Sequence, residues 1–149
     1  MSKHESWRTR KYWSSTGGLL IEEFLAVRTT KANGRRSIDG VIVLNEETRI
    51  HDDNFYNIEG KDVIVIQTKR SRIGMYLLGQ AYFSKFLIEQ LKPRSIKIVA
   101  ICSKYDDVIG QLAKANKVEV VVISDKGYDA KFDSPKYLEE NKTLYNMKK

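Results

Sequence analysis

The chain contains very little cysteine, little proline and no long apolar run. Its 149 residues include one cysteine, Cys102, and two prolines. A single thiol excludes an intramolecular disulfide and a cysteine-rich zinc site, and it is typical of a reducing compartment, so we expect a cytoplasmic protein. No apolar run approaches the roughly 18–20 residues that span a bilayer, and the first residues lack the apolar stretch of a signal peptide. We therefore expect a soluble, intracellular protein without a membrane-spanning segment.

The length and composition fit one globular domain. A mass of 17.2 kDa with 42% hydrophobic residues allows a sizeable core but is too small for two ordinary domains. We expect a single domain over residues 1–149, with a basic and aromatic N-terminal arm over 1–15 and a polar C-terminal tail over 128–149.

The charge is positive and concentrated in two segments. Lys and Arg number 26 against 19 Asp and Glu, a net charge of +7. Residues 1–36 hold 8 basic and 3 acidic groups and residues 67–97 hold 7 and 1, whereas residues 45–62 hold 6 acids against 2 bases. Such a field favours a polyanionic partner, with nucleic acid first and a membrane surface second.

The N-terminal arm mixes cations with aromatic rings. Arg8, Arg10 and Lys11 stand between Trp7 and Trp13. The cations could contact phosphates while the rings contact bases or sugars. Alternatively, the tryptophans pack on the domain and the arm is a solvated segment, because an exposed Trp is costly. The sequence leaves both interpretations open.

Apolar periodicity predicts an α/β fold. Leu20, Phe24 and Val27 at helical spacing, after capping residues at 14–16, predict a helix over 17–27. The strands, helices and connections that we expect after it are as follows: strands over 37–44, 62–69, 95–102 and 118–123, helices over 73–91 and 106–115, a short helix after Ser134-Pro135, and an acidic loop over 45–62 with an additional strand or turn. The helix over 73–91 is apolar on more than one face, which predicts that it is largely buried. Near-continuous apolar strands separated by helices predict a sheet covered on both faces.

Polar residues interrupt two of these strands. Asp39 follows Ile38, and Gln67 and Lys69 are two apart, so strand alternation points both to the same face. Glu22 and Glu23 would point about 100° apart on a helix, so at most one of them faces a shared site. Carboxylate and amide oxygens suit Mg²⁺ or Mn²⁺, and a lysine beside them could orient water or neutralise phosphate. This set of groups is typical of metal-dependent phosphodiester hydrolysis.

In order and spacing, these residues resemble the PD-(D/E)XK nuclease superfamily, which has the restriction-endonuclease-like fold with an α-β-β-β-α-β core. The matching segments are Gly18-Leu-Leu-Ile-Glu22, Ile-Asp39-Gly-Val and Gln67-Thr-Lys69. Gln67 stands where most members have an acid, so the chain is most similar to the QxK branch, as in Mrr-like restriction enzymes. Archaeal Holliday-junction resolvases are more distant relatives.

The resemblance implies a central mixed sheet of four to five strands flanked by helices, whose first strand lies between Val27 and Asp39. It implies a Mg²⁺- or Mn²⁺-dependent DNA endonuclease in which Glu22, Asp39 and Gln67 hold the metal. Lys69 would position or help to deprotonate the attacking water. Family and size also suggest a homodimer with one site for each DNA strand.

Further cations flank the matched motifs. Arg35 and Arg36 precede the Asp39 strand, Arg70 and Arg72 follow Lys69, and all four are candidate phosphate contacts or an ordinary basic rim. The resemblance adds Gln80 as a polar residue lining the site. Two alternatives remain open, namely a non-catalytic DNA-binding module on the same fold and a small α/β protein with no role in nucleic-acid binding.

Overall fold

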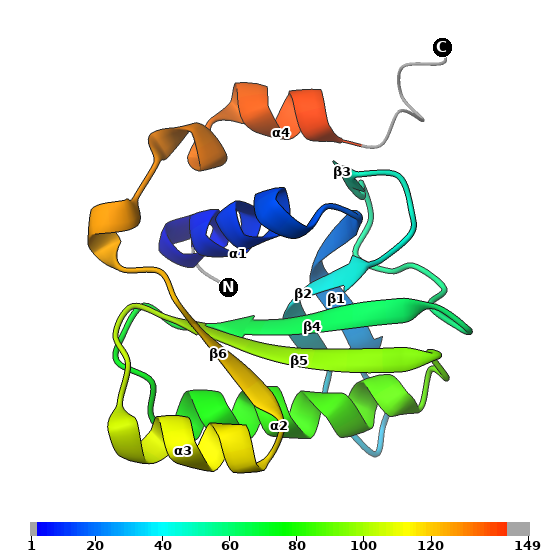
Figure 1. Ribbon diagram of the computed structural model, residues 1–149. Helices are drawn as coiled ribbons and strands as arrows, with labels where there is room; N and C mark the ends of the chain where they lie inside the picture. The colour runs from blue at the N-terminus through cyan, green and yellow to red at the C-terminus, as the bar shows by residue number, and fades with distance from the viewer. Residues whose placement is uncertain (1–2, 143–149) are drawn as a thin grey trace.

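A computed structural model describes residues 3–142 of the protein. It shows a six-stranded mixed sheet with helices on both faces (Figure 1). The strand order is β3-β1-β2-β4-β5-β6. The strands are β1 (Leu19–Val27), β2 (Arg36–Val43), β3 (Arg49–Ile50), β4 (Asp62–Thr68), β5 (Ser95–Cys102) and β6 (Val118–Val122).

The pairing divides the sheet into an antiparallel and a parallel half. β2 is antiparallel to both β1 and β4, whereas β4, β5 and β6 are parallel to one another. Parallel neighbours need a crossover connection. Helix α2 (Met75–Glu89) joins β4 to β5, and helix α3 (Asp107–Ala115) joins β5 to β6.

Each face of the sheet has its own helical layer and its own core. Helices α2 and α3 lie below the sheet in Figure 1, and α1 (Lys3–Thr16) and α4 (Pro135–Asn141) lie above it. The core on the α2 side includes Ile21, Val41 and Val65, whereas the core on the α1 side is centred on Trp13 and Ile66. Consecutive strand residues therefore enter opposite cores, which accounts for the near-continuous apolar runs.

Most predicted elements are confirmed with shifts of one or two residues. The strands β2, β4, β5 and β6 and the helices α2, α3 and α4 all form where the sequence predicts them. Asp106 caps α3 by accepting from the Ile109 amide, and Ser134 caps α4 by accepting from the Tyr137 amide. The expected additional strand in the acidic loop is β3, which pairs with β1. With β3, the sheet has six strands rather than the four to five expected.

The predicted helix over 17–27 is wrong, because this segment is strand β1. Gly17 and Gly18 have positive φ values of 74° and 92°, and they end α1 rather than begin a second helix. A Cβ on Gly18 would lie 2.7 Å from the Val43 carbonyl oxygen, so the close approach of β1 to β2 requires glycine there. The strand pairings of β1 on both sides override the helical spacing, and the first core strand therefore lies before Val27 rather than after it.

The expected N-terminal arm is helix α1, and its tryptophans are buried. Trp7 is 3% exposed and Trp13 is 1% exposed, so the prediction that the tryptophans pack on the domain is confirmed, but the segment that carries them is a packed helix rather than a solvated arm. The Arg8 guanidinium is fully buried, where it donates to the Ile123 carbonyl and pairs with Asp125. Residues 1–2 of the expected arm and 143–149 of the expected tail lie outside the described residues.

The prediction that the helix over 73–91, here α2, is largely buried is wrong. One face, which includes Leu77, Ala81 and Ile88, packs against the sheet. The other face exposes four large apolar side chains, namely Met75, Tyr76, Phe83 and Phe86. No described element of the chain covers this second apolar face.

Candidate metal and nucleic-acid site

Asp39 lies where β2 begins and β4 ends. Its Oδ2 atom accepts a hydrogen bond of 2.9 Å from the backbone amide of Thr68. Thr68 is the residue between Gln67 and Lys69, so this bond places the Asp39 carboxylate against the backbone of the segment that carries both of them. The structure therefore brings three of the four residues predicted for the catalytic site to neighbouring strand ends.

The Gln67 side chain is buried and its amide orientation is determined by α2. Gln67 is 7% exposed, and its Nε2 atom donates to Ser84 Oγ at 2.8 Å. The Ser84 hydroxyl donates its only proton to the Gln80 carbonyl at 2.6 Å, so it must accept from the amide nitrogen of Gln67. The Gln67 amide oxygen accepts no hydrogen bond from the described residues and is available as a ligand.

Lys69 follows β4 and lies on the same side of the sheet as Gln67, as strand alternation predicts. Its Nζ atom is 5.4 Å from the centroid of the Tyr76 ring in the first turn of α2, and the side chain is exposed. Its backbone amide donates to the Ile101 carbonyl, which extends the pairing with β5. The ammonium group is therefore held near the surface at the end of the two strands.

Glu22 lies on the opposite face of the sheet from Gln67. Its carboxylate accepts two hydrogen bonds from Arg10 of α1, at 2.8 and 3.2 Å, and both side chains are mostly buried. Arg10 also donates to the Phe132 carbonyl at 2.6 Å. The predicted helix acid therefore ties β1 to α1 and to the C-terminal segment, and the structure does not bring it to the Gln67 side.

Glu23 occupies the position across from Asp39. The β1–β2 register pairs Glu22 with Gly40 and Phe24 with Ile38, so Glu23 lies opposite Asp39 between these pairs. Glu23 has φ of +50°, which is unusual for a residue with a Cβ and is often found beside functional sites. The sequence alone did not decide whether Glu22 or Glu23 faces Asp39. The pairing of β1 with β2 is what distinguishes the two acids.

The side chains of Asp39, Glu23 and Gln67 carry the kind of oxygen atom that hard divalent cations prefer. Among the described residues, no group of three His, Cys, Asp or Glu side chains could hold a metal ion. Asp39, Glu23 and the Gln67 amide oxygen supply two carboxylates and one neutral oxygen from neighbouring strands. Mg²⁺ uses one or two carboxylates and keeps several waters, so this donor set suits it.

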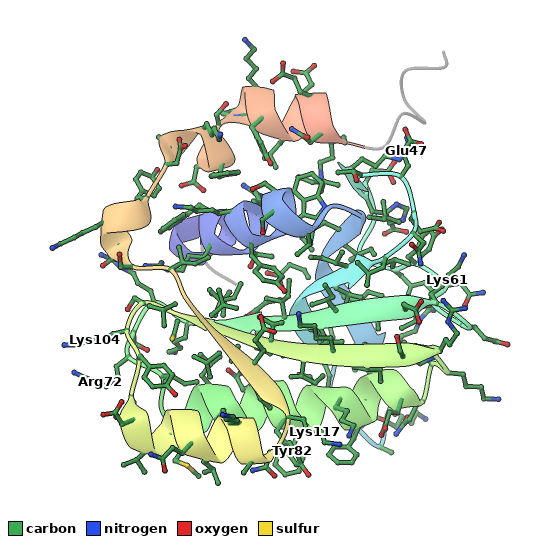
Figure 2. All side chains as sticks on the ribbon, in the orientation of Figure 1. Glu47, Lys61, Arg72, Tyr82, Lys104 and Lys117 are labelled. Carbon is green, nitrogen blue, oxygen red and sulfur yellow. The ribbon has the colours of Figure 1, made fainter. Side chains whose placement is uncertain are left out.

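Five cations gather at the end of the sheet where β4 and β5 finish and β2 begins. We call this region the basic end, and its exposed side chains are Arg35, Arg36, Lys69, Arg72 and Lys104. None of them forms an ion pair with any residue in 6–142. Figure 2 shows Arg72 and Lys104 close together at the left edge, and a parallel bridge pairs the two backbones. Their unneutralised charge suits a phosphate backbone.

The other predicted nucleic-acid contacts are placed differently. Arg8 and Arg10 are buried in the internal contacts described above, and Lys11 donates to the Gly127 carbonyl at 2.7 Å. Arg70 is 3.5 Å from an Asp125 carboxylate oxygen, so its charge is partly neutralised. Gln80 is exposed on α2 and lines a groove beside Gln67.

Cys102 ends β5 and belongs to the core, as its position in the sequence predicts. It is 0% exposed, and burial raises the pKa of its thiol above the ordinary value. A buried thiol with a raised pKa is a poor nucleophile. The chemistry at this end of the sheet therefore rests on oxygen ligands and cations.

Comparisons with protein-family models, with curated proteins and with solved structures find no match for this chain. Within residues 3–142, no helix combines the length and the apolar character needed to cross a membrane. Any functional assignment therefore depends on the chemistry of the residues themselves.

Proposed function

We propose that the protein is a Mg²⁺- or Mn²⁺-dependent DNA endonuclease with a restriction-endonuclease-like fold. The observation that carries the proposal is the hydrogen bond from the Thr68 amide to Asp39. It joins the acid of one strand to the Gln67-Thr68-Lys69 motif of the next. The two motifs that resemble the nuclease superfamily in sequence are thus adjacent in space.

The topology supports the proposal independently of the side chains. The family core order α-β-β-β-α-β corresponds to α1, β1, β2, β4, α2 and β5. Two antiparallel pairings, β1–β2 and β2–β4, are followed by a helical crossover to a parallel neighbour, β5. The additional elements β3, α3, β6 and α4 lie outside this core.

The proposed mechanism assigns a role to each group. Asp39, Glu23 and the amide oxygen of Gln67 would hold the metal, which when bound supplies Lewis-acid activation of water and of the phosphate. Lys69 orients the attacking water and offsets the negative charge that develops on the phosphate. The remaining cations of the basic end bind the flanking phosphates.

A cleavage assay tests this proposal. Wild-type protein is incubated with supercoiled, linear, single-stranded and branched DNA in Mg²⁺ or Mn²⁺, beside Asp39→Ala and Lys69→Ala variants. Glu47→Ala and Lys117→Ala, two exposed residues away from the basic end, are the matched controls. We expect metal-dependent cutting that the first pair abolishes and the controls retain.

The assay also separates the enzyme from a binding module. If wild-type protein binds these DNAs but cuts none of them, and Asp39→Ala binds equally well, the enzymatic proposal fails. The protein would then be a non-catalytic DNA-binding module. If the protein does not bind DNA even at low salt, both the nuclease and the DNA-binding module are contradicted.

A further inference from the structure

A groove lies between α2 and the start of β2, directly beside Gln67. It has a volume of about 420 Å³. Phe83 and Phe86 of α2 form one side and Arg36 of β2 stands on the other, with Gln67 and Gln80 also in the lining. The groove therefore combines aromatic rings, amide groups and one guanidinium.

The aromatic side of the groove is exposed to solvent. Phe83 is 64% exposed and Phe86 is 43% exposed, and their ring centroids are 6.0 Å apart. Tyr82, which is half-buried against the core, supports both rings edge-on, at 5.3 Å from Phe83 and 5.5 Å from Phe86. A supported pair of exposed rings offers a surface on which a planar group can stack.

The polar side of the groove specifies the charge of its occupant. Arg36 is the only charged group among the described residues that line the groove, and it has no acidic partner among residues 6–142. The exposed amide of Gln80 can both donate and accept hydrogen bonds. An occupant that is anionic at one end and carries a planar, hydrogen-bonding ring at the other matches this lining. A nucleotide has this chemistry.

The groove and the proposed metal site share a wall. Gln67 belongs to both, and Ile38, which also lines the groove, immediately precedes Asp39. A nucleotide whose base occupies the groove would therefore place an adjoining phosphate near Asp39 and Lys69. A base inside a continuous duplex is stacked and paired, so it must leave the helix or come from an unpaired strand to enter.

We propose that the groove between α2 and β2 binds an unstacked nucleobase next to the phosphate that is cut, so that unpaired DNA is the preferred substrate. This inference rests on the proposed function for the identity of the neighbouring site. The aromatic rings supply stacking, the amides contact the edge of the base, and Arg36 binds a flanking phosphate. Stacking of one base on an aromatic side chain contributes enough for about a tenfold change in affinity.

The test measures binding without cleavage. A fluorescein-labelled single-stranded oligonucleotide and the same strand in a perfect duplex are titrated in EDTA, and the ratio of the two dissociation constants is followed. Phe83→Leu removes the aromatic ring but keeps an apolar side chain. We expect it to weaken single-strand binding about tenfold with little change for the duplex, and we expect Phe83→Trp to restore the single-strand affinity.

Leu112→Ala is the matched control, because Leu112 is 41% exposed on α3 and does not line the groove. We expect it to leave the ratio unchanged. An unchanged ratio in Phe83→Leu would overturn the proposal. So would a wild-type dimer in sedimentation velocity that Phe83→Glu converts to a monomer, because this aromatic face would then be the interface between two copies.

The two proposals fail in different ways. If single-stranded and duplex DNA are cut equally fast, and Phe83→Leu does not change the rate, the protein is a nuclease but the groove does not bind a base. If the protein prefers single strands, the preference depends on Phe83 and no DNA is ever cut, the base-binding groove is supported and the nuclease proposal fails.

Discussion

Several basic side chains at the two ends of the sheet differ in whether an acid pairs with them. At the basic end, Arg72 and Lys104 are exposed without an acidic partner among the described residues. At the other end, where β4 and β5 begin, Arg49, Lys61 and Arg94 pair with acids; we call these three residues the paired end. Figure 2 shows Lys61 at the right edge, far along the sheet from Arg72 and Lys104.

This difference separates charges that organise the fold from charges that face outward. Asp62 accepts hydrogen bonds from Arg94 and Ser95, and so holds together the starts of β4 and β5. Near Lys69, Arg70 lies 3.5 Å from an Asp125 carboxylate oxygen, but Lys69, Arg72 and Lys104 have no acidic partner among residues 6–142. The positive field is therefore retained where Asp39 and Gln67 lie, which is the property that recruitment of a polyanion requires.

The largest expected effect comes from removing two cations at each end in turn. One double variant combines Arg72→Ala with Lys104→Ala, and the other combines Lys61→Ala with Arg94→Ala. The two double variants change the net charge equally. We expect the first pair to reduce the steepness of log affinity against log salt by about 2. Near 0.1 M salt, each lost phosphate contact should lower the DNA affinity about tenfold. Fluorescence anisotropy over a salt series measures it. Equal losses from both pairs would show that net charge alone matters.

The second expected effect distinguishes the two adjacent acids of β1. Glu22→Gln weakens a mostly buried, charge-assisted pair with Arg10, so we expect a loss of about 2 kcal/mol in the free energy of unfolding. Urea denaturation measures it. Glu23→Gln should weaken Mg²⁺ or Mn²⁺ binding in calorimetry, whereas Glu22→Gln should leave that binding unchanged. The reverse pattern would assign the metal to Glu22.

A smaller effect is expected from two serines, one toward each end of the sheet. Ser84→Ala removes the acceptor that orients the Gln67 amide, so we expect Mn²⁺ affinity to fall about tenfold, as for other groups that orient a metal ligand. Ser95→Ala removes a hydroxyl that donates to Asp62 at the other end. Isothermal titration should show unchanged Mn²⁺ binding for Ser95→Ala. Similar losses in both would contradict the orienting role.

The smallest effect concerns the pH response of the paired end. Hydrogen bonds from Arg94 and Ser95 lower the pKa of Asp62 to about 2 from 3.8. A lowered pKa means that this contribution to stability is complete above about pH 4 and is lost as the pH falls toward 2. NMR titration of the Asp62 carboxyl should show this pKa, and Arg94→Ala should return it toward 3.8. An unchanged value in Arg94→Ala would show that the ion pair does not form in solution.

The sequence predicted the parallel half of the sheet better than its antiparallel half. β4, β5 and β6 are nearly unbroken β-branched runs, and the helices between them have a clear cap at Asp106 or end before a proline. The segment at 19–27 has apolar spacing that fits a helix, yet it forms β1. Its pairing with β2 and β3 decided this, and such long-range contacts are not readable from local spacing.

The candidate site was predicted in part for the same reason. Alternation within one strand correctly placed Gln67 and Lys69 on one side, but the choice between Glu22 and Glu23 needed the register of β1 against β2. The sequence placed Arg8 and Arg10 among the surface cations, because their acidic partners, Asp125 and Glu22, are distant in sequence or lie in a segment predicted as a helix.

The sequence by itself determined the α/β class, the central strands and helices, and the polar residues that interrupt them, because these follow from local periodicity and composition. Only the tertiary structure decided which face each acid takes, which cations are neutralised, and that the second apolar face of α2 is left open. The physical reason is that burial and ion pairing depend on partners brought together by strand register and helix packing, and those partners are set by the whole chain.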